Sequence, residues 1–352
     1  MSPISVTGTA GSESPALTAL ATAREVLDVP MREAVGRLAP PVRDVAAYHF
    51  GWVDADGTAG EAHRGKAIRG TLAMLSAEAV GAQASEGVPG ALAVEFVHNF
   101  SLLHDDFMDG DTERRHRSTA WTVFGSSAAI LAGDALLALA FETLLQVDPV
   151  RAQPAGRSLA AASQRLIVGQ VGDLDLERRL DVTLAECLEM AAGKTASLMA
   201  CSASIGAHLA AAPADAVRAL DEFGYELGLA FQLVDDLLGI WGASASTGKP
   251  VGADLRARKN SLPVVAAMNS GTAAGAELRS LYGSGALNPE ADDDAVARAS
   301  ALVDEAGGRA WAVDESQRRL DRACEALAGS ELDQPTTQLL TQIAQYVTAR
   351  DH

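Results

Sequence analysis

The sequence predicts an all-α protein, and three observations support this fold class. Helix-favouring Ala, Leu, Glu and Arg dominate the composition, and aromatic residues make up 5% of the chain. Apolar residues recur three and four positions apart, whereas the alternation typical of strands is nearly absent. A chain of 352 residues is long enough for one large helical domain or two smaller ones. With no boundary signal, we predict one all-helical domain over residues 16–352 after a flexible N-terminal tail over 1–15.

Helices are expected along most of this domain. The first covers residues 16–29, and Pro30 interrupts it before a second helix over 31–38. A polar loop at residues 54–60 then brings Arg64, Lys66 and Arg69 to the start of a helix that reaches Val80. Apolar spacing predicts further helices over residues 120–145, 159–176, 183–209, 214–241, 292–305, 309–327 and 335–346.

Charge and cysteine content exclude several classes of function. The net charge of −18 argues against nucleic acid as a partner, because phosphate backbones bind basic surfaces. Cys187, Cys201 and Cys324 have neither zinc-site spacing nor an even count, so we interpret them as reduced core thiols. No N-terminal stretch resembles a signal peptide, and no apolar run is long enough to span a bilayer. We therefore expect a cytoplasmic protein without membrane insertion.

The stretch from Val94 to Trp121 carries the clearest chemistry. An apolar helical run ends in four aspartates, and three arginines follow. Asp105 and Asp109 begin and end a D-D-x-x-D spacing, so their carboxylates lie on one helix face and can share a cation. Mg²⁺ fits best, because it favours carboxylate oxygens and completes its shell with substrate phosphates, which arginines also bind. A solvated helix end with local salt bridges explains this motif alone equally well.

A second aspartate-rich stretch decides between these interpretations. Asp235 and Asp236 end another apolar run, and Lys249, Asp254 and Lys259 follow in a polar loop. With both stretches present, the sequence resembles the trans-isoprenyl diphosphate synthase (polyprenyl synthetase) family, most of all a bacterial geranylgeranyl diphosphate synthase. The resemblance covers about residues 65–263. It implies a single-domain, isoprenoid-synthase-type helical bundle around a central apolar cavity, in which the two motifs face each other.

The resemblance also implies the reaction and the groups that bind its substrates. An allylic diphosphate ionises with the help of metal, and the resulting cation condenses with isopentenyl diphosphate. The resemblance implies that isopentenyl diphosphate is bound by Lys66, Arg69, His98 and Arg115. It implies that the allylic diphosphate is bound by Arg114, Lys194, Lys249 and Lys259. Taken from the residues alone, Lys66 and Arg69 also fit exposed positions at a helix start, and His98 also fits a core histidine.

Metal and catalytic roles follow from the same resemblance. The resemblance implies that up to three Mg²⁺ ions bind together with the substrate diphosphate and that Asp105, Asp109 and Asp235 are their ligands. It implies catalytic roles for Lys194, Thr195, Gln232 and Lys249. Gln170 and Asp173 are expected to face the cavity, and the small residues around Lys194 favour a kink or a cavity-lining helix. The family is commonly homodimeric, so we expect a homodimer.

Two residues depart from the family pattern. Gly239 stands at the third position of the second D-D-x-x-D, so one carboxylate is missing from that motif. We expect activity to survive this change and metal affinity to be the property affected. His116 stands where a glycine often follows the arginine pair.

Chain length is predicted from the residues just before the first motif. Phe100 and Ser101 resemble the aromatic and small pair of geranylgeranyl diphosphate synthases, which predicts a C20 product. The alternative is a farnesyl diphosphate synthase with a C15 product. A class I terpene cyclase is less favoured, because residues 225–240 lack an N-x-x-x-S-x-x-x-E triad and a cyclase has no use for Lys66, Arg69 and Arg115. A non-catalytic partner subunit, with Gly239 as a mark of decay, conflicts with the retention of the other site residues.

Overall fold

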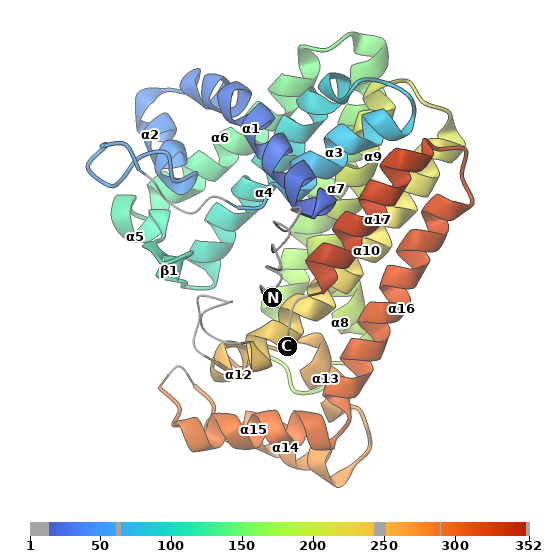
Figure 1. The fold of residues 1–352 in the computed structure, drawn as a ribbon. Helices are drawn as coiled ribbons and strands as arrows, with labels where there is room; N and C mark the ends of the chain where they lie inside the picture. The colour runs from blue at the N-terminus through green and yellow to red at the C-terminus, as the bar shows by residue number, and fades with distance from the viewer. Residues whose placement is uncertain (1–13, 61–64, 243–250, 289, 350–352) are drawn as a thin grey trace, which may run out of the picture.

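The two helices that end in the aspartate motifs belong to the inner part of a helical bundle (Figure 1). α4 spans Ala84–Met108 and α10 spans Ala214–Trp241. α9, Ser197–Leu209, packs against both of them and also against the neighbouring helices α3 and α7. Because α9 contacts both motif helices, it fixes their separation, and their C-terminal ends line the same cavity.

The computed structural model describes residues 14–60, 65–242, 251–288 and 290–349. In this part of the chain the strands are limited to one short antiparallel pair and an isolated bridge between Val53 and Ala59. The predicted all-α fold class is therefore confirmed. The remaining elements, in chain order, are α1 (Pro15–Gly36), α2 (Pro40–His49), α3 (Ile68–Ala79), β1 (Glu113–Arg114), β2 (Arg117–Ser118), α5 (Ala120–Phe124), α6 (Ser126–Leu145), α7 (Pro149–Leu176), α8 (Leu184–Ala191), the π-helix η1 (Ala192–Ala196), α12 (Ala253–Arg256), α13 (Leu262–Met268), α14 (Ala273–Gly283), α15 (Asp293–Glu305), α16 (Gly308–Ala328) and α17 (Gln334–Thr348).

The outer helices cover this inner group on several sides. α6 packs along α4, and α16 packs along α10. α14 and α15 lie side by side across the lower end of the molecule in Figure 1, where they pack with α13 around a separate apolar cluster. The three cysteines are free, and Cys187 and Cys201 are buried, as the sequence predicts. Cys324 is only partly buried, so its prediction as a core thiol is wrong.

Glycines allow the inner helices to approach closely. A Cβ at Gly206 of α9 would overlap the backbone carbonyl oxygen of Ala73 in α3. A Cβ at Gly224 of α10 would lie 2.5 Å from the carbonyl oxygen of Met199 in α9. Side chains at these positions would force the helices apart, and close-packed interiors tolerate such changes poorly.

Several predicted helix boundaries are wrong, and each has a local reason. α1 continues through Pro30. Proline has no N–H to donate to the carbonyl oxygen of Val26, and because Val26 is exposed, water can bind that carbonyl instead. The predicted helix over 120–145 divides into α5 and α6 at Gly125, which has φ 87°. α7 begins at Pro149 rather than at residue 159, because the side chain of Asp148 caps it by accepting the N–H of Val150.

The predicted helix over 183–209 contains a change of helix type. α8 starts with a capping box between Thr183 and Glu186. The turn Ala192–Ala196 is then a π-helix, after which α9 continues. The irregularity expected around Lys194 is therefore present, and π-helical turns often occur at functional sites.

α6 corrects the expectation that no apolar run is long enough to span a membrane. It has 20 residues and a mean hydropathy of 1.8, which meets the length and composition of a spanning segment. However, 44% of that stretch is buried inside the protein, where it packs mainly against α4. A core helix of a bundle has the same composition, so this property alone is weak support for a membrane span.

The close packing of α9 on α3 predicts opposite effects for two glycine substitutions. Gly206→Ala should lower the free energy of unfolding by about 1–3 kcal/mol, because its Cβ overlaps backbone that cannot move easily. The control is Gly156→Ala in α7, where a Cβ meets nothing within 4 Å. It should raise stability by up to about 1 kcal/mol, because alanine favours helix over glycine. Urea denaturation measures both, and equal effects would contradict the packing argument.

Candidate active site

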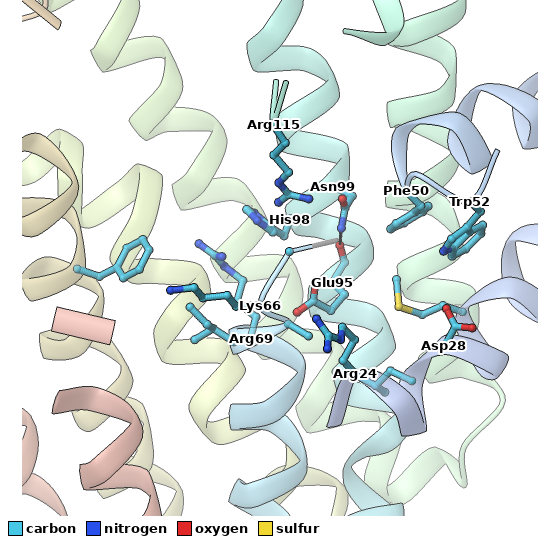
Figure 2. Close-up of a pocket in the computed structure, with 16 residues that line it drawn as sticks. Arg24, Asp28, Phe50, Trp52, Lys66, Arg69, Glu95, His98, Asn99 and Arg115 are labelled. Carbon is cyan, nitrogen blue, oxygen red and sulfur yellow. Dashed lines mark hydrogen bonds between the residues drawn. The ribbon is translucent and has the colours of Figure 1, made fainter. Parts of the chain in front are cut away.

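A basic cavity of about 440 Å³ lies beside the middle of α4 (Figure 2). All four residues that the sequence assigns to isopentenyl diphosphate line it, and they are Lys66, Arg69, His98 and Arg115. Sequence reasoning missed three further charged residues of the lining, Arg24, Asp28 and Glu95. Arg24 gave no signal, because it belongs to a distant helix, whereas Glu95 precedes His98 by one helical turn.

Burial makes this cavity electrostatically unusual. It lowers the pKa of the Arg69 guanidinium, although the Glu95 and Asp235 carboxylates oppose the shift. It also lowers the pKa of Arg115, and the neighbouring Arg114 lowers it further. The pKa of His98 falls well below its ordinary value, through burial and then through the charges of Arg69 and Arg115. Neutral His98 keeps one N–H donor, so the cavity presents cations and a donor to an anion.

Glu95 is the buried counter-charge of this cavity. Its side chain is 8% exposed, and its Oε1 accepts the backbone N–H of Gly70 at 2.9 Å. Burial raises the pKa of Glu95, while the Gly70 hydrogen bond and the Arg69 charge lower it. The Nε of Arg69 is buried and has no hydrogen-bond partner among the described residues. Glu95 therefore balances part of the positive charge and leaves donors for a ligand.

A tight hairpin delivers neighbouring arginines to two different cavities. β1 and β2 pair Arg114 with Arg117, and the two turn residues, Arg115 and His116, have φ values of 52° and 62°. Both values are in the left-handed region that glycine adopts most easily, which explains the glycine often found at position 116 in the family. The Arg115 guanidinium lies against Gly65, where a Cβ would be 2.9 Å from Nη2. The absence of a side chain at Gly65 thus leaves room for it.

A second cavity, of about 450 Å³ and mainly acidic, lies between the ends of α4 and α10. Seven aspartates line it, against three basic residues. Most of the predicted metal, allylic-diphosphate and catalytic residues meet here, namely Asp105, Asp109, Arg114, Lys194, Gln232, Asp235 and Lys259. Lys249 lies outside the described residues.

Lys194 is positioned by the close approach of α7 to η1. A Cβ at Gly169 of α7 would overlap the backbone nitrogen of Lys194, and Gly193 meets the same helix. The Lys194 Nζ forms an ion pair with Asp173 Oδ2 at 2.5 Å. Asp173 lines the acidic cavity as predicted. Gln170 does not line either of the two cavities, and its buried amide has no hydrogen-bond partner in the described part of the chain.

The second aspartate of each motif anchors a neighbouring side chain. Asp106 Oδ1 accepts the Nε–H of Arg114 at 2.6 Å. Asp236 accepts the Gln232 amide at 2.7 Å and the backbone N–H of Leu262 at 2.8 Å. Gln232 Oε1 in turn accepts the hydroxyl of Thr195 at 2.6 Å. These contacts hold predicted site residues in place, and they engage carboxylates that were not assigned to metal.

The remaining carboxylates fit a divalent cation shared with a ligand. The pKa of Asp105 is raised to about 6, chiefly by burial, which together with the Asp109 charge outweighs the lowering effect of Lys194. Oδ1 of Asp109 is buried without a hydrogen-bond partner among the described residues. Within those residues, no group of three His, Cys, Asp or Glu side chains is arranged to hold a metal by itself. Mg²⁺ commonly takes one or two carboxylates and fills its shell with water and phosphate oxygens, so the residues fit this ion.

The two predicted chain-length residues lie in the packed part of α4. Phe100 is 6% exposed, and its ring meets the His104 ring edge-on at 4.8 Å between centroids. A Cβ at Gly133 of α6 would overlap the ring of His104. Ser101 donates its hydroxyl to the carbonyl oxygen of His98 at 2.8 Å. Phe100 is thus held between α4 and α6, one turn before the first aspartate motif.

The raised pKa of Asp105 predicts a pH-dependent effect on the metal-free protein. Asp105→Asn should raise the free energy of unfolding by about 1–3 kcal/mol near pH 8, because it removes a poorly solvated charge. The folded carboxyl, with a pKa of about 6 against 3.8, binds its proton more tightly than the unfolded chain does. The gain should therefore appear as the pH rises through about 4 to 6 and vanish below about 4.

Thermal unfolding in EDTA across this pH range measures the effect. Asp44→Asn, at an exposed carboxylate, is the control and should stay within about 0.5 kcal/mol of the parent. A metal-free Asp105→Asn variant that is less stable than the parent near pH 8 would show that the carboxylate is structural.

Comparisons with known proteins agree with this geometry. The family model described as polyprenyl synthetase matches residues 58–299. The chain is 45% identical to a (2E,6E)-farnesyl diphosphate synthase of Mycobacterium tuberculosis, over 95% of this chain and 93% of that protein. It is also 45% identical to a geranylgeranyl diphosphate synthase of the same species, over 84% of both chains. A crystal structure of a polyprenyl synthetase from Streptomyces coelicolor A3(2) matches with a TM-score of 0.91 and 49% identity, over 95% of this chain and 100% of that one.

The family model covers well over half of the chain, and the relatives match it along most of their own length. A basic cavity lies beside the middle of α4, and an acidic cavity lies between the ends of α4 and α10. This chain therefore belongs to the polyprenyl synthetase (trans-isoprenyl diphosphate synthase) family and is a prenyltransferase.

Proposed function

We propose that this prenyltransferase condenses isopentenyl diphosphate with an allylic diphosphate and that its product is geranylgeranyl diphosphate (C20). The observation that carries the proposal is the pairing of a basic cavity with an adjacent acidic one. The basic cavity has four cationic side chains against two carboxylates, which suits an anion bound without metal. The acidic cavity suits an anion that arrives with divalent cations.

In this proposal each cavity performs one half of the reaction. Lys66, Arg69 and Arg115 bind isopentenyl diphosphate, and neutral His98 donates a hydrogen bond to it. Arg114, Lys194 and Lys259 surround the allylic diphosphate. Asp105, Asp109 and Asp235 would hold Mg²⁺, which would supply charge that stabilises a departing diphosphate. Because Arg114, Lys194 and Lys259 are in place before the C–O bond breaks, they stabilise the transition state more than the ground state.

Lys194 and Lys259 of the acidic cavity remain charged at neutral pH. Burial lowers the pKa of Lys194, but Asp173 and Asp105 outweigh it and raise the pKa overall. Lys259 behaves in the same way, with Asp254 and Asp109 as the main carboxylates. Both lysines can therefore hold a diphosphate throughout ionisation. The departed diphosphate is the proposed acceptor of the proton that is lost in the last step.

We also propose that the protein is a cytoplasmic homodimer. Leu131 of α6 is 57% exposed, and Val168 and Val171 of α7 are 70% and 64% exposed. Apolar faces of this kind on an otherwise acidic protein suit a second copy of the chain. A mass of two chains in sedimentation equilibrium would support the dimer, and the mass of one chain would contradict it. The free, buried thiols of Cys187 and Cys201 suit the reducing environment of the cytoplasm.

The first experiment is product analysis with purified protein, Mg²⁺ and isopentenyl diphosphate. Dimethylallyl, geranyl and farnesyl diphosphates are offered separately as the allylic partner. We expect a C20 diphosphate from farnesyl diphosphate. A stop at C15 would keep the reaction and favour a farnesyl diphosphate synthase, the activity named for one of the relatives. Hydrocarbon released from an allylic substrate alone would indicate a cyclase, and no product at all would indicate a non-catalytic subunit.

The position of Phe100 predicts a change in product length. Phe100→Ala should extend the product beyond C20, because the tail grows into space that the ring now fills beside His104. The control is Phe223→Ala in α10, which opens a similar cavity in a different apolar cluster. Both variants should lose about 3–5 kcal/mol of stability, but the control should keep the parent product. An unchanged profile for Phe100→Ala, in folded protein, would contradict the role of this ring.

A further inference from the structure

We propose that Asn99 is a further substrate-binding residue of the basic cavity, and that His49 is the positioning residue that holds its amide ready for the diphosphate. Neither residue receives a role from the sequence. His49 is the last residue of α2, and Asn99 lies in α4 directly after His98. The inference rests on the proposed function, because the ligand is the diphosphate of isopentenyl diphosphate.

The Asn99 side chain forms part of the wall of the basic cavity (Figure 2). Asn99 is 7% exposed, so its polar atoms have little access to bulk water. Its Nδ2 donates to the carbonyl oxygen of Glu95 at 2.8 Å, and its Oδ1 lies 3.1 Å from Nε2 of His49. The amide nitrogen has a second N–H, which donates to no other described residue. A buried donor without an acceptor is unfavourable, so this N–H suits an anion in the cavity.

The two contacts of Asn99 fix the orientation of its amide. Only the amide nitrogen can donate to the carbonyl oxygen of Glu95, because the amide oxygen is an acceptor. Oδ1 therefore faces His49, and Nε2 of His49 must carry the proton that Oδ1 accepts. If the amide turned over, oxygen would face oxygen at Glu95 and two N–H donors would meet at His49. The His49 donor thus favours the orientation that leaves one N–H for a ligand.

His49 suits this positioning role because it is buried and neutral. Its pKa is lowered to about 3, chiefly by burial and then by the nearby charges of Arg114 and Arg115. The imidazole therefore keeps a single ring proton throughout the neutral range. The contact with Asn99 places that proton on Nε2, so the same donor is present whenever the enzyme is at work.

The end of α2 that carries His49 is tied to the hairpin of β1 and β2. The Tyr48 hydroxyl donates to the carbonyl oxygen of Ser118 at 2.7 Å, and the Arg117 guanidinium donates to the carbonyl oxygen of Tyr48 at 3.1 Å. The same guanidinium lies over the Tyr48 ring, 4.3 Å from its centroid. Contacts on the residue before it therefore hold His49 in place behind the cavity wall.

The alternative is that the hydrogen bond between His49 and Asn99 only joins α2 to α4. A purely structural bond would contribute to folding stability and would leave the ligand affinity of the folded protein unchanged. An amide that binds substrate would weaken the affinity when it is removed, and a positioning histidine would matter only while that amide is present. The two explanations thus differ in ligand binding and in whether the two substitutions act independently.

The test is isothermal titration calorimetry of the metal-free full chain with isopentenyl diphosphate in EDTA. Asn99→Leu should weaken binding about 10–100-fold, as expected for a lost hydrogen bond to a charged group. Asn99→Asp keeps the shape and an acceptor for His49 but has no donor, so it should weaken binding at least as much. Inorganic diphosphate should lose affinity in the same proportion, because the contact is to phosphate oxygens. Unchanged affinity in folded Asn99 variants, or a loss for isopentenyl diphosphate alone, would overturn the proposal.

Substitutions of His49 test the positioning role. His49→Phe keeps a ring but removes the donor, and it should weaken binding by less than Asn99→Leu does. His49→Gln should restore most of the affinity, because its side-chain amide can donate from about the place of Nε2. The double variant of His49→Phe with Asn99→Leu should bind no more weakly than Asn99→Leu alone. Additive losses, or no recovery in folded His49→Gln, would overturn the positioning role.

Two substitutions of the same kind, at residues that line neither cavity, are the controls. Asn269→Leu removes an amide that binds the carbonyl oxygens of Val182 and Val265, and His208→Phe removes an imidazole near the end of α9. Both should bind isopentenyl diphosphate as the parent does. During turnover, Asn99→Leu and His49→Phe should raise KM for isopentenyl diphosphate and leave KM for the allylic diphosphate unchanged.

Failure of this inference is distinguishable from failure of the proposed function. Binding in EDTA involves no condensation, so the expected losses of affinity can appear even if the product is not C20 or no product forms. A C20 product together with unchanged binding in the Asn99 variants would keep the proposed function and reject the inference. A parent protein that binds no isopentenyl diphosphate in EDTA would reject the inference together with the assignment of the basic cavity.

Discussion

The burial of like charges beside one another is the constraint on which this molecule depends. Arg69 and Arg115 share one cavity, while the aspartates of two helices share the next. In a low-dielectric interior such groups repel, and each cavity on its own is an unfavourable arrangement. The bundle holds them through helix contacts that do not involve the charges, chiefly the glycine-lined approach of α9 to α3 and α10. In the proposed reaction, substrate and metal would neutralise these charges.

The second aspartates show how anchoring and ligand binding are divided within one motif. Asp106 fixes Arg114, and Asp236 fixes Gln232 and the first turn of α13. The preceding aspartates, Asp105 and Asp235, line the acidic cavity, and neither is engaged in these anchoring hydrogen bonds. Adjacent residues in a helix point about 100° apart, so a pair of aspartates can serve two different partners. Counting aspartates in such a motif therefore overstates the number that can bind a metal.

Sequence reasoning succeeded where the signal was local and failed where it was spatial. Apolar spacing located α10 to the residue, and Lys194 and Asp235 were identified because they belong to local motifs that resemble those of the family. The break at Gly125 was missed, because a single left-handed residue does not disturb an apolar pattern. Arg24 and Glu95 were missed because only the packing of α1, α3 and α4 brings them to the cavity. The contact between His49 and Asn99, 50 positions apart in the chain, likewise depends on packing that composition does not reveal.

The two-residue turn at Arg115 and His116 has a consequence for how such enzymes diversify. Arg114 serves the acidic cavity and Arg115 the basic one, although a single peptide bond joins them. A change in the length or twist of this hairpin would move both guanidinium groups at once. A mutation that reshapes the hairpin therefore alters both cavities together. The residues that line one cavity cannot evolve independently of those that line the other.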